Sequence, residues 1–291
     1  MALKIEKLNY VYSEGNAYEV HALKDVDLEI PDGEFLALIG HTGSGKSTLV
    51  QHLNGLMKAT SGAIYENGKN IYDEDFDMRA LRSRVGLVFQ YPEYQLFEET
   101  VLKDVMFGPK NLGLDEDAAR EKALEALRLV GVSEEYYDKA PFELSGGQKR
   151  RVAIAGIVAM EPQCLVLDEP TAGLDPQGRD EIFNLVSSLH REKGISIVLV
   201  SHSMEDVANY ASRIVVMNDG RILYDDVSGA VFEHWQELEK IGLSAPEVTY
   251  VMQRLKKDGW DVDTGATTIT KAKESILASF RAGEGGPCSE R

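Results

Sequence analysis

The chain has 291 residues, of which 43% are hydrophobic and 27% charged, so it can bury a core in one large domain and a smaller one. Its 31 basic and 48 acidic side chains give a net charge of −17, which opposes attraction to nucleic acid and anionic lipid, and we expect no nucleic-acid partner. Apolar runs end well short of the roughly 20 residues that cross a bilayer, and Cys164 and Cys288 are the only cysteines, so we expect no membrane span and a reducing cytoplasm.

Strand and helix patterns alternate along the chain. The expected strands are 3–12, 33–40, 85–90, 164–169, 196–202 and 213–220. Expected helices follow at 47–57, 186–194 and 204–212. Because strands that alternate with helices form parallel sheets covered on both faces, we expect an α/β fold with a mostly parallel core sheet.

Two regions depart from this alternation. Between about 91 and 160 the pattern is helical, which indicates a helical insertion in the sheet. From 225 to 280 three further helical patterns indicate a small C-terminal module, and the Gly-rich, polar residues 281–291 predict a disordered tail.

The turn after the second expected strand reads GHTGSGKST and matches the GxxxxGK[ST] phosphate loop. Its glycines allow successive backbone N–H groups to converge on phosphate oxygens at a helix N-terminus. We expect Lys46 to reach the β and γ phosphates and Ser47 to ligate Mg²⁺. The residues expected to bind a nucleoside triphosphate are Gly40, His41, Thr42, Gly43, Ser44, Gly45, Lys46, Ser47 and Thr48.

Polar side chains end three other expected strands. Asp168 and Glu169 end CLVLDE, Gln90 ends VGLVFQ and His202 ends SIVLVSH. Because the carboxyl ends of parallel strands meet at one ligand-binding edge, these side chains are expected beside the phosphates. Asp168 would hold Mg²⁺, and Glu169 would act as general base on the attacking water. Gln90 would touch either Mg²⁺ or that water, and His202 would bond the γ-phosphate.

The segment LSGGQ, 144–148, precedes an amphipathic helical run. Ser145 and Gln148 have the spacing of a capping box, in which a hydroxyl and an amide satisfy backbone donors at a helix start. Gly146 and Gly147 do not suit a cap alone, because glycine within a helix costs about 1 kcal/mol relative to alanine. We therefore expect another group to approach this backbone closely.

The phosphate loop, Gln90, LSGGQ, CLVLDE, the AGLD of 172–175 and His202 occur in the order and spacing of an ABC-transporter ATPase, which the chain resembles. This resemblance implies an ABC ATPase domain of the P-loop NTPase fold over 1–224, with an N-terminal antiparallel β subdomain and a helical signature subdomain at 91–160. It also implies an aromatic that stacks on adenine, best matched by Tyr12, with Tyr10 and Tyr18 as weaker candidates.

In ABC ATPases two such domains face head to tail, and the signature loop of one covers the γ-phosphate held by the phosphate loop of the other. The residues that would contact ATP bound by a partner are Leu144, Ser145, Gly146, Gly147 and Gln148. Asp175, on the AGLD loop, would run along the same dimer seam. Each chain would thus hold two half-sites.

More specific similarity lies in FQYPEYQLFEETVLKDVMFGPKNLG at 89–113 and in the C-terminal VFEHWQELEKIGLSAPEVTYVMQRL. Both segments resemble the ATPases of energy-coupling factor transporters, relatives of the cobalt-importer ATPase, and HTGSGKSTLVQHLNGL is most similar to the second of two paralogous ATPases. This resemblance implies ATP and Mg²⁺ as cofactors and a peripheral location on the cytoplasmic face of the cell membrane. Implied partners are a second, paralogous ATPase, a transmembrane coupling protein and an interchangeable solute-binding membrane protein for a vitamin or metal ion.

Several alternatives remain open in the sequence. The chain could be an ABC ATPase of regulation or DNA maintenance without a membrane partner, or a phosphate-loop kinase, although the signature and His202 oppose a kinase. The segment YPEYQLFEE, 91–99, suits a groove for a basic helix of the coupling protein, or else a solvated loop. The module at 225–280 would extend the dimer interface or act as a buttress.

Overall fold

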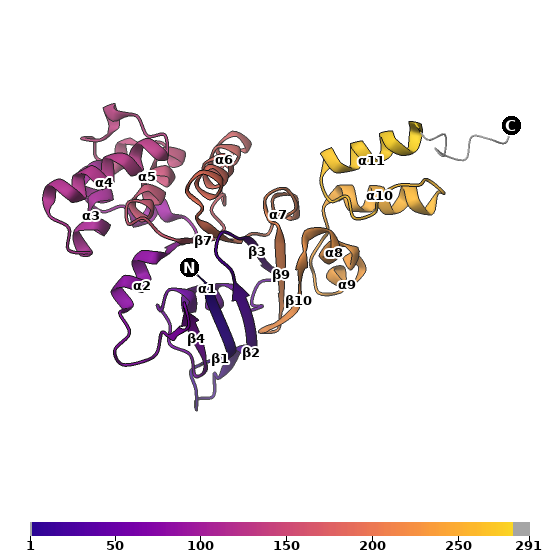
Figure 1. Cartoon of the computed structure of the whole chain (residues 1–291), viewed down its shortest axis with the longest axis horizontal. Helices are drawn as coiled ribbons and strands as arrows, with labels where there is room; N and C mark the ends of the chain where they lie inside the picture. Colours follow the sequence, from indigo (N-terminus) through magenta and orange to yellow (C-terminus); the bar gives the residue numbers. More distant parts are fainter. Residues whose placement is uncertain (1, 282–291) are drawn as a thin grey trace.

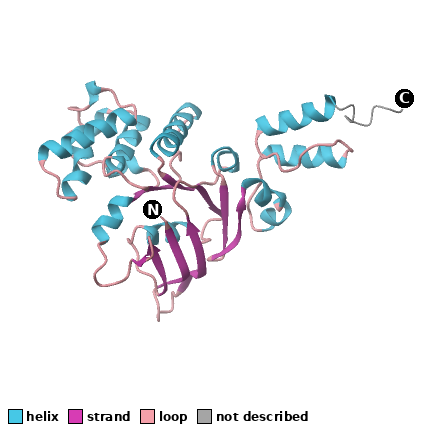
Figure 2. Cartoon of the chain, in the orientation of Figure 1, coloured by secondary structure: helices cyan, strands magenta, loops and turns pink. Residues whose placement is uncertain are grey.

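The computed structural model describes residues 2–281, which form two sheets with most of the helices on one side of them (Figures 1 and 2). The larger sheet has the order β10-β9-β3-β8-β7-β6. Its strands are β3 (Phe35–Gly40), β6 (Val85–Val88), β7 (Cys164–Asp168), β8 (Ser196–Val200), β9 (Arg213–Asn218) and β10 (Arg221–Val227). All pairings are parallel except that of β10 with β9, so the expectation of a mostly parallel core sheet is confirmed.

The smaller sheet is antiparallel and has the order β2-β1-β4-β5. Its strands are β1 (Leu3–Tyr12), β2 (Val20–Ile30), β4 (Ser61–Glu66) and β5 (Lys69–Asn70). The antiparallel N-terminal β region implied by the family resemblance is therefore present. Only β1 was expected from the sequence pattern, because β5 has two residues, β4 begins with the turn-like Ser61 and Gly62, and β2 includes a mixed polar stretch before its alternating half.

Two hydrophobic cores lie on opposite faces of the parallel sheet. In β3, Leu36 and Leu38 face one core while Ala37 and Ile39 face the other, as the strand period of two requires. The first core lies against the antiparallel sheet and α1 (Lys46–Leu53), which continues directly from the phosphate loop. Because both faces are covered, β3, β6, β7 and β8 are buried along their whole length.

Helices cover the second core. They are α3 (Val101–Asn111), α4 (Glu116–Leu129), α5 (Gly146–Val158), α6 (Pro176–Lys193) and α7 (Met204–Tyr210). The first three, with 3-10 turns η1 (Pro92–Gln95), η2 (Glu134–Tyr136) and η3 (Pro141–Glu143), fall within the expected helical insertion. A further short helix, α2 (Met78–Arg84), precedes β6.

Two elements differ from the sequence expectation. Helix α6 begins at Pro176 rather than near 186, because the Asp175 carboxylate accepts the Gly178 N–H at 2.7 Å and caps its start. Strand β10 was missed, and it extends to Val227, across the boundary expected between 224 and 225. A tight turn at Asp219 and Gly220, both at positive φ, folds β10 back on β9.

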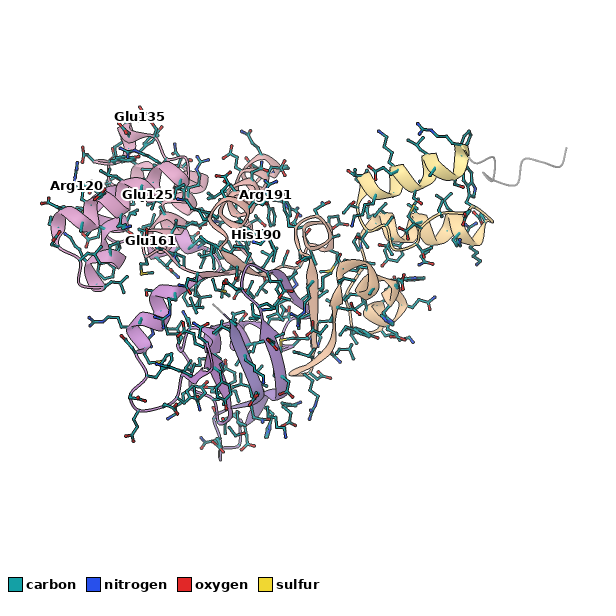
Figure 3. The ribbon with its side chains drawn as sticks, in the orientation of Figure 1. Arg120, Glu125, Glu135, Glu161, His190 and Arg191 are labelled. Carbon is teal, nitrogen blue, oxygen red and sulfur yellow. The ribbon has the colours of Figure 1, made fainter. Side chains whose placement is uncertain are left out.

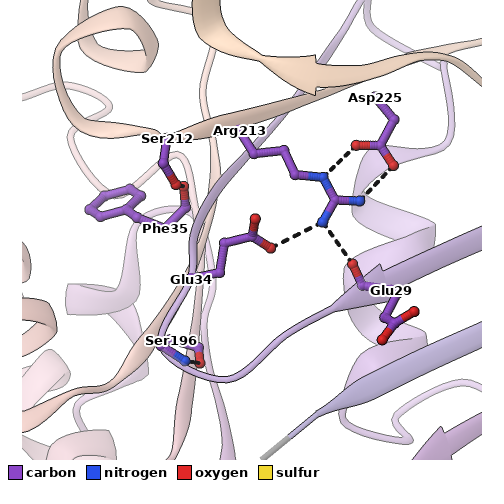
Figure 4. Close-up of polar contacts among 8 residues, drawn as sticks. Glu29, Glu34, Phe35, Ser196, Ser212, Arg213 and Asp225 are labelled. Atoms are coloured by element: carbon purple, nitrogen blue, oxygen red, sulfur yellow. Dashed lines mark hydrogen bonds and ion pairs between the residues drawn. The ribbon is translucent and has the colours of Figure 1, made fainter.

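Arg213 connects the edge of the parallel sheet to the antiparallel sheet (Figure 4). From β9 it forms a bidentate pair with Asp225 of β10, at 2.5 and 2.6 Å. Its third nitrogen donates to the Glu34 carboxylate at 3.1 Å and to the Glu29 carbonyl at the end of β2 at 3.0 Å. The two sheets are therefore joined by a planar, directional group.

The C-terminal region has two parts. Its helices are α8 (Ser228–Glu233), α9 (Trp235–Lys240), α10 (Glu247–Lys257) and α11 (Ile269–Arg281). Phe232 and Leu238, from the first pair, are buried in the second core, whereas α10 and α11 share a small cluster centred on Met252. The tail expected at 281–291 lies outside the described residues, apart from Arg281. Within 2–281, no helix has the length and apolarity needed to span a bilayer.

Candidate functional site

The phosphate loop connects β3 to α1, and two of its glycines are required by this chain's own packing. At Gly45, φ is +104°, and an added Cβ would lie 2.6 Å from the Ala22 carbonyl oxygen. A Cβ at Gly40 would collide with the Ser44 hydroxyl and the Met217 carbonyl. The loop is therefore a tight cradle, and at these two positions no larger residue can follow its backbone.

Lys46 lies inside this cradle and is only 6% exposed. Its Nζ donates to the Gly40 carbonyl at 2.7 Å and to the His41 carbonyl at 3.0 Å, both neutral acceptors. Burial lowers the pKa of Lys46, while the nearby charges of Glu169 and Asp168 raise it. A buried ammonium held by carbonyls favours an anionic guest such as a phosphate.

The other residues of the phosphate loop include a buried hydroxyl that suits the same anion. The Ser44 hydroxyl is buried in the loop without a hydrogen-bond partner, although most buried polar groups have one. The His41 ring is held by the Thr42 carbonyl at 2.8 Å and by Asn218 at 3.1 Å. Gly43 has φ +83°, which glycine adopts readily.

Tyr12 is the one of three candidate aromatics that contacts the phosphate loop. Its hydroxyl lies 3.1 Å from Thr48 Oγ1, and 39% of the residue is exposed. Tyr10 instead packs edge-on against His52, and Tyr18 is 85% exposed. This geometry favours Tyr12 as the adenine-stacking residue, and the assignment stays a prediction.

The structure brings Gln90, Glu169 and His202 together at the C-terminal edge of the parallel sheet. Glu169 follows β7, and its carboxylate accepts the Gln90 amide at 3.1 Å and meets His202 Nε2 at 2.8 Å. Its backbone has φ +50°, and its N–H donates to the Val200 carbonyl at the end of β8 at 3.0 Å. Two side chains from neighbouring strand ends therefore hold the carboxylate, while the end of β8 holds the Glu169 backbone, as expected for parallel strand ends.

Asp168 ends β7 beside this carboxylate and is buried. Burial raises the pKa of Asp168, and a hydrogen bond from the Ser47 hydroxyl opposes that rise. Among residues 2–281, no cluster of three or more His, Cys, Asp or Glu side chains could hold a metal. The pair of Asp168 and Ser47 nevertheless suits Mg²⁺, which takes few protein ligands and completes its shell with phosphates and water.

The LSGGQ segment begins α5 with the expected capping box. The Gln148 amide oxygen accepts the Ser145 N–H at 2.9 Å, and the Ser145 hydroxyl accepts the Gln148 N–H at 3.4 Å. Leu144 anchors the segment in the core. At Gly146 and Gly147, an added Cβ would meet no atom within 4 Å. This chain's packing therefore does not require the two glycines.

Sequence analysis missed Arg150, which is 1% exposed. It pairs with Glu93 at 2.5 Å and bonds the backbone after Glu169. A pattern was available, since Arg150, Ile154 and Val158 recur every four residues and are all buried. The KRR run conceals it, because consecutive basic residues suggest a solvated face.

Sequence analysis also missed Arg179, which bonds residues that follow His202 in the chain. Arg179, in the first turns of α6, bonds Asp206 through Nε at 3.0 and 3.1 Å and Ser203 through Nη2 at 2.5 Å. Ser203 also caps α7. The helix that Asp175 caps is thereby connected to the loop that carries His202.

A hollow of about 440 Å³ between α4 and α6 is separate from these groups. Glu125 and Glu161, labelled in Figure 3, lie at its wall and pair with Lys193 and Lys122. None of the site residues expected from the sequence lines this hollow.

Comparison with known proteins agrees with this geometry. The family model for ABC transporters matches residues 23–172. The energy-coupling factor transporter ATP-binding protein EcfA2 of Clostridium perfringens is 53% identical over 97% of this chain and 99% of its own length. Its namesake from Clostridium tetani is 54% identical over 96% of this chain and 98% of its own.

Solved structures show the same fold. The cbiO1 protein of Clostridium perfringens, part of the ABC transporter complex cbiONQ, aligns with a TM-score of 0.72 and 42% identity over 86% of this chain and 98% of that one. The ATP-binding cassette MJ0796, dimeric in a post-hydrolysis state with ADP and Pi, aligns with a TM-score of 0.69 and 31% identity over 78% of this chain and 98% of that one. These matches confirm the resemblance seen in the sequence: the chain belongs to the ATP-binding subunits of energy-coupling factor transporters, ABC ATPases whose ATP hydrolysis is coupled to transport.

Proposed function

We propose that this chain binds Mg²⁺-ATP and hydrolyses it to power uptake of a vitamin or metal ion through a transmembrane coupling protein and an interchangeable solute-binding membrane protein. The main support for this proposal is that Gln90 and His202 hold the Glu169 carboxylate between them, beside the phosphate loop. A carboxylate fixed by two polar side chains is suited to orient a water molecule for attack.

In the hydrolysis step, Glu169 accepts a proton from water as the water oxygen bonds to the γ-phosphorus. The bond from that phosphorus to the β–γ bridging oxygen breaks, and ADP and phosphate leave. Lys46 and the loop N–H groups offset the negative charge on the phosphates. His202 Nε2 meets the Glu169 carboxylate at 2.8 Å and holds the base, and its proposed donation to a γ-phosphate oxygen replaces that contact when ATP binds.

Asp168, Ser47 and Gln90 are the proposed holders of Mg²⁺. When bound, the ion would neutralise phosphate charge and order the β and γ phosphates. Asp168 already accepts from Ser47, so the two oxygens lie together before any ligand binds. Tyr12 is the proposed adenine platform, since its ring is partly exposed next to Thr48.

LSGGQ is proposed to contact ATP held by a second, paralogous ATPase. Support comes from Gly146 and Gly147, where an added Cβ meets nothing in this chain. Their openness suits the approach of an anion from outside, at the positive N-terminus of α5. Asp175, which caps α6, is proposed to lie along the same seam.

The coupling protein is proposed to dock in a groove of about 540 Å³ between η1, α3 and α5. Phe97 and Phe107 line it, are 64% and 44% exposed, and pack edge to face at 4.9 Å. Asp104 lies at its wall and places a carboxylate beside these rings. Arg79 and Arg82 of α2 also line the groove, so its apolar floor with charges of both signs suits a helix that carries apolar side chains together with charged ones. The peripheral position on the cytoplasmic membrane face follows from such docking.

The test is the ATPase rate of the complex purified through this chain. Glu169→Gln is expected to reduce the rate by at least about 100-fold, the range of a general base, and to retain ATP binding. Glu125→Gln, at the remote hollow, is the matched control and should keep the wild-type rate. Mass spectrometry of the same preparation identifies the second ATPase and the membrane partners. An unchanged Glu169→Gln rate, or a preparation without membrane partners, would overturn the proposal.

A further inference from the structure

Arg150 forms a hydrogen-bonded junction inside the helical part of the chain. It is 1% exposed on α5 and donates from Nε and Nη2 to the two carboxylate oxygens of Glu93, at 2.9 and 2.5 Å. Its Nη1 donates to the Pro170 carbonyl at 3.0 Å and to the Ala172 carbonyl at 2.8 Å. Four of its N–H groups are thus shared between two segments distant in sequence.

Each of these segments adjoins a part of the proposed machinery. Glu93 lies in η1, between Gln90 and the groove residue Phe97. The Pro170 and Ala172 carbonyls lie in the loop that leads from Glu169 toward Asp175. Arg150 itself follows LSGGQ in the first turns of α5. One side chain therefore contacts the groove segment and the catalytic loop while belonging to the signature helix.

Stability alone is a weak reason for such a junction. A buried ion pair is often replaceable by apolar side chains without loss of stability, because removing two charges from water opposes their attraction. A planar guanidinium does something an apolar side chain cannot, since its bidentate fork sets the relative orientation of the groups it binds. The Tyr91 ring, 5.9 Å from the guanidinium carbon, covers this arrangement, and Tyr91 has φ +55°.

We propose that Arg150 is the positioning residue that couples the docking groove to ATP hydrolysis. When a docked helix moves η1, the Glu93 carboxylate moves with it, and Arg150 transmits that displacement to α5 and to the loop after Glu169. The signature and the catalytic carboxylate then shift together. This inference rests on the proposed function and adds the residue through which the membrane partner controls the site.

The test uses Glu93→Gln in the complete complex purified through this chain. The amide keeps the size of the side chain and removes the charge that makes the fork bidentate. Glu181→Gln is the matched control, because it removes the carboxylate from the neighbouring Arg151, at 2.6 Å. We expect Glu93→Gln to lower kcat about tenfold, within the usual range of coupling between sites, with KM for ATP and subunit composition unchanged. Glu181→Gln should retain the wild-type kcat.

A purely structural role is separated by thermal melting and by a second variant. Arg150→Lys keeps the buried cation but cannot reach Glu93 and both carbonyls at once, so it should lose kcat similarly with a melting temperature above that of the assay. Wild-type kcat in both variants would overturn the inference, as would an equal loss in Glu181→Gln. A loss that follows only a lowered melting temperature would also overturn it. Since Glu169→Gln and the subunit composition test the proposed function independently, the two failures are distinguishable.

Discussion

Two glycines of this chain, Gly45 and Gly147, differ in what surrounds them. Gly45 is required internally, because an added Cβ would lie 2.6 Å from the Ala22 carbonyl and its φ is +104°. Gly147 has neither constraint, since nothing lies within 4 Å of an added Cβ. Gly45 is therefore explained by packing within the chain, whereas Gly147 leaves space for a group from outside it.

This difference gives a prediction for Gly147→Asp. We expect the isolated chain to fold and bind ATP as the wild type does, because no contact within it is disturbed. ATP-dependent closure with the second ATPase should be lost, because the new carboxylate would repel the partner's γ-phosphate. Fluorescent nucleotide binding measures the first property, and size exclusion of a hydrolysis-deficient complex measures the second. Loss of ATP binding at this chain's own phosphate loop would contradict the assignment.

At this scale the sequence predicts residues that act near their motif and misses those that act through distant contacts. Lys46, Glu169 and His202 were found because each stands at a strand end or in a short motif. The Arg150–Glu93 pair joins residues separated by 57 positions, and no local pattern states that distance. The Arg150–Glu93 pair forms because α5 packs against η1, and that packing is known only from the folded structure.

Among the helices, α5 and α4 begin with comparable caps but differ in what lies beyond their first turn. Ser145 caps α5, and Asp115 caps α4 by accepting the Ala118 N–H at 2.9 Å. Each cap satisfies one of the unpaired donors at a helix start. Only α5 carries the open glycines immediately after its cap.

Ser145→Ala and Asp115→Ala should therefore separate stability from activity. Each substitution is expected to lower the free energy of unfolding by about 1 kcal/mol, the usual loss of an N-cap. Only Ser145→Ala should also lower the ATPase rate of the complex, since it alone alters the segment proposed to contact the partner's ATP. Urea denaturation and steady-state rates are the measurements. An equal rate for the two variants would show that α5 has no special role.

Sequence patterns identified the buried strands better than the elements at the edges. Strands β3, β7 and β8 are buried throughout because both faces are covered, and each contains an apolar run that is easily recognised. Strand β10 lies at a sheet edge with five of its seven residues exposed, so its sequence resembles a loop. The first half of α6 is polar for a similar reason, and its start is defined by the Asp175 cap rather than by apolar spacing.

For the whole molecule, the sequence predicted the α/β class and the helical insertion, because the periodicity changes from two to 3.6 in long segments. It did not predict that α8 and α9 belong to the main core while α10 and α11 form their own cluster. Helices α10 and α11 are amphipathic, and amphipathicity does not state which surface covers the apolar face.

Binding of ATP should stabilise the whole molecule, because a ligand that binds only the folded state adds to its stability. At about 100 times its Kd, Mg²⁺-ATP contributes about 2.7 kcal/mol, which raises the melting temperature by several degrees for a chain of this size. Glu169→Gln protein, which we expect to retain the nucleotide, suits this measurement by differential scanning calorimetry. Lys46→Ala should show no such rise. A shift of the same size in Lys46→Ala would indicate that ATP binds elsewhere.

Glu169 has a left-handed backbone, with φ +50°, and at this position backbone stability and the need for a carboxylate favour different residues. A non-glycine residue in this conformation costs about 1–2 kcal/mol, and glycine would remove that cost. Glycine would also remove the carboxylate that Gln90 and His202 hold. Glycine at position 169 would therefore raise the stability of the fold and remove the proposed general base. Selection for stability alone would act against ATP hydrolysis at this position.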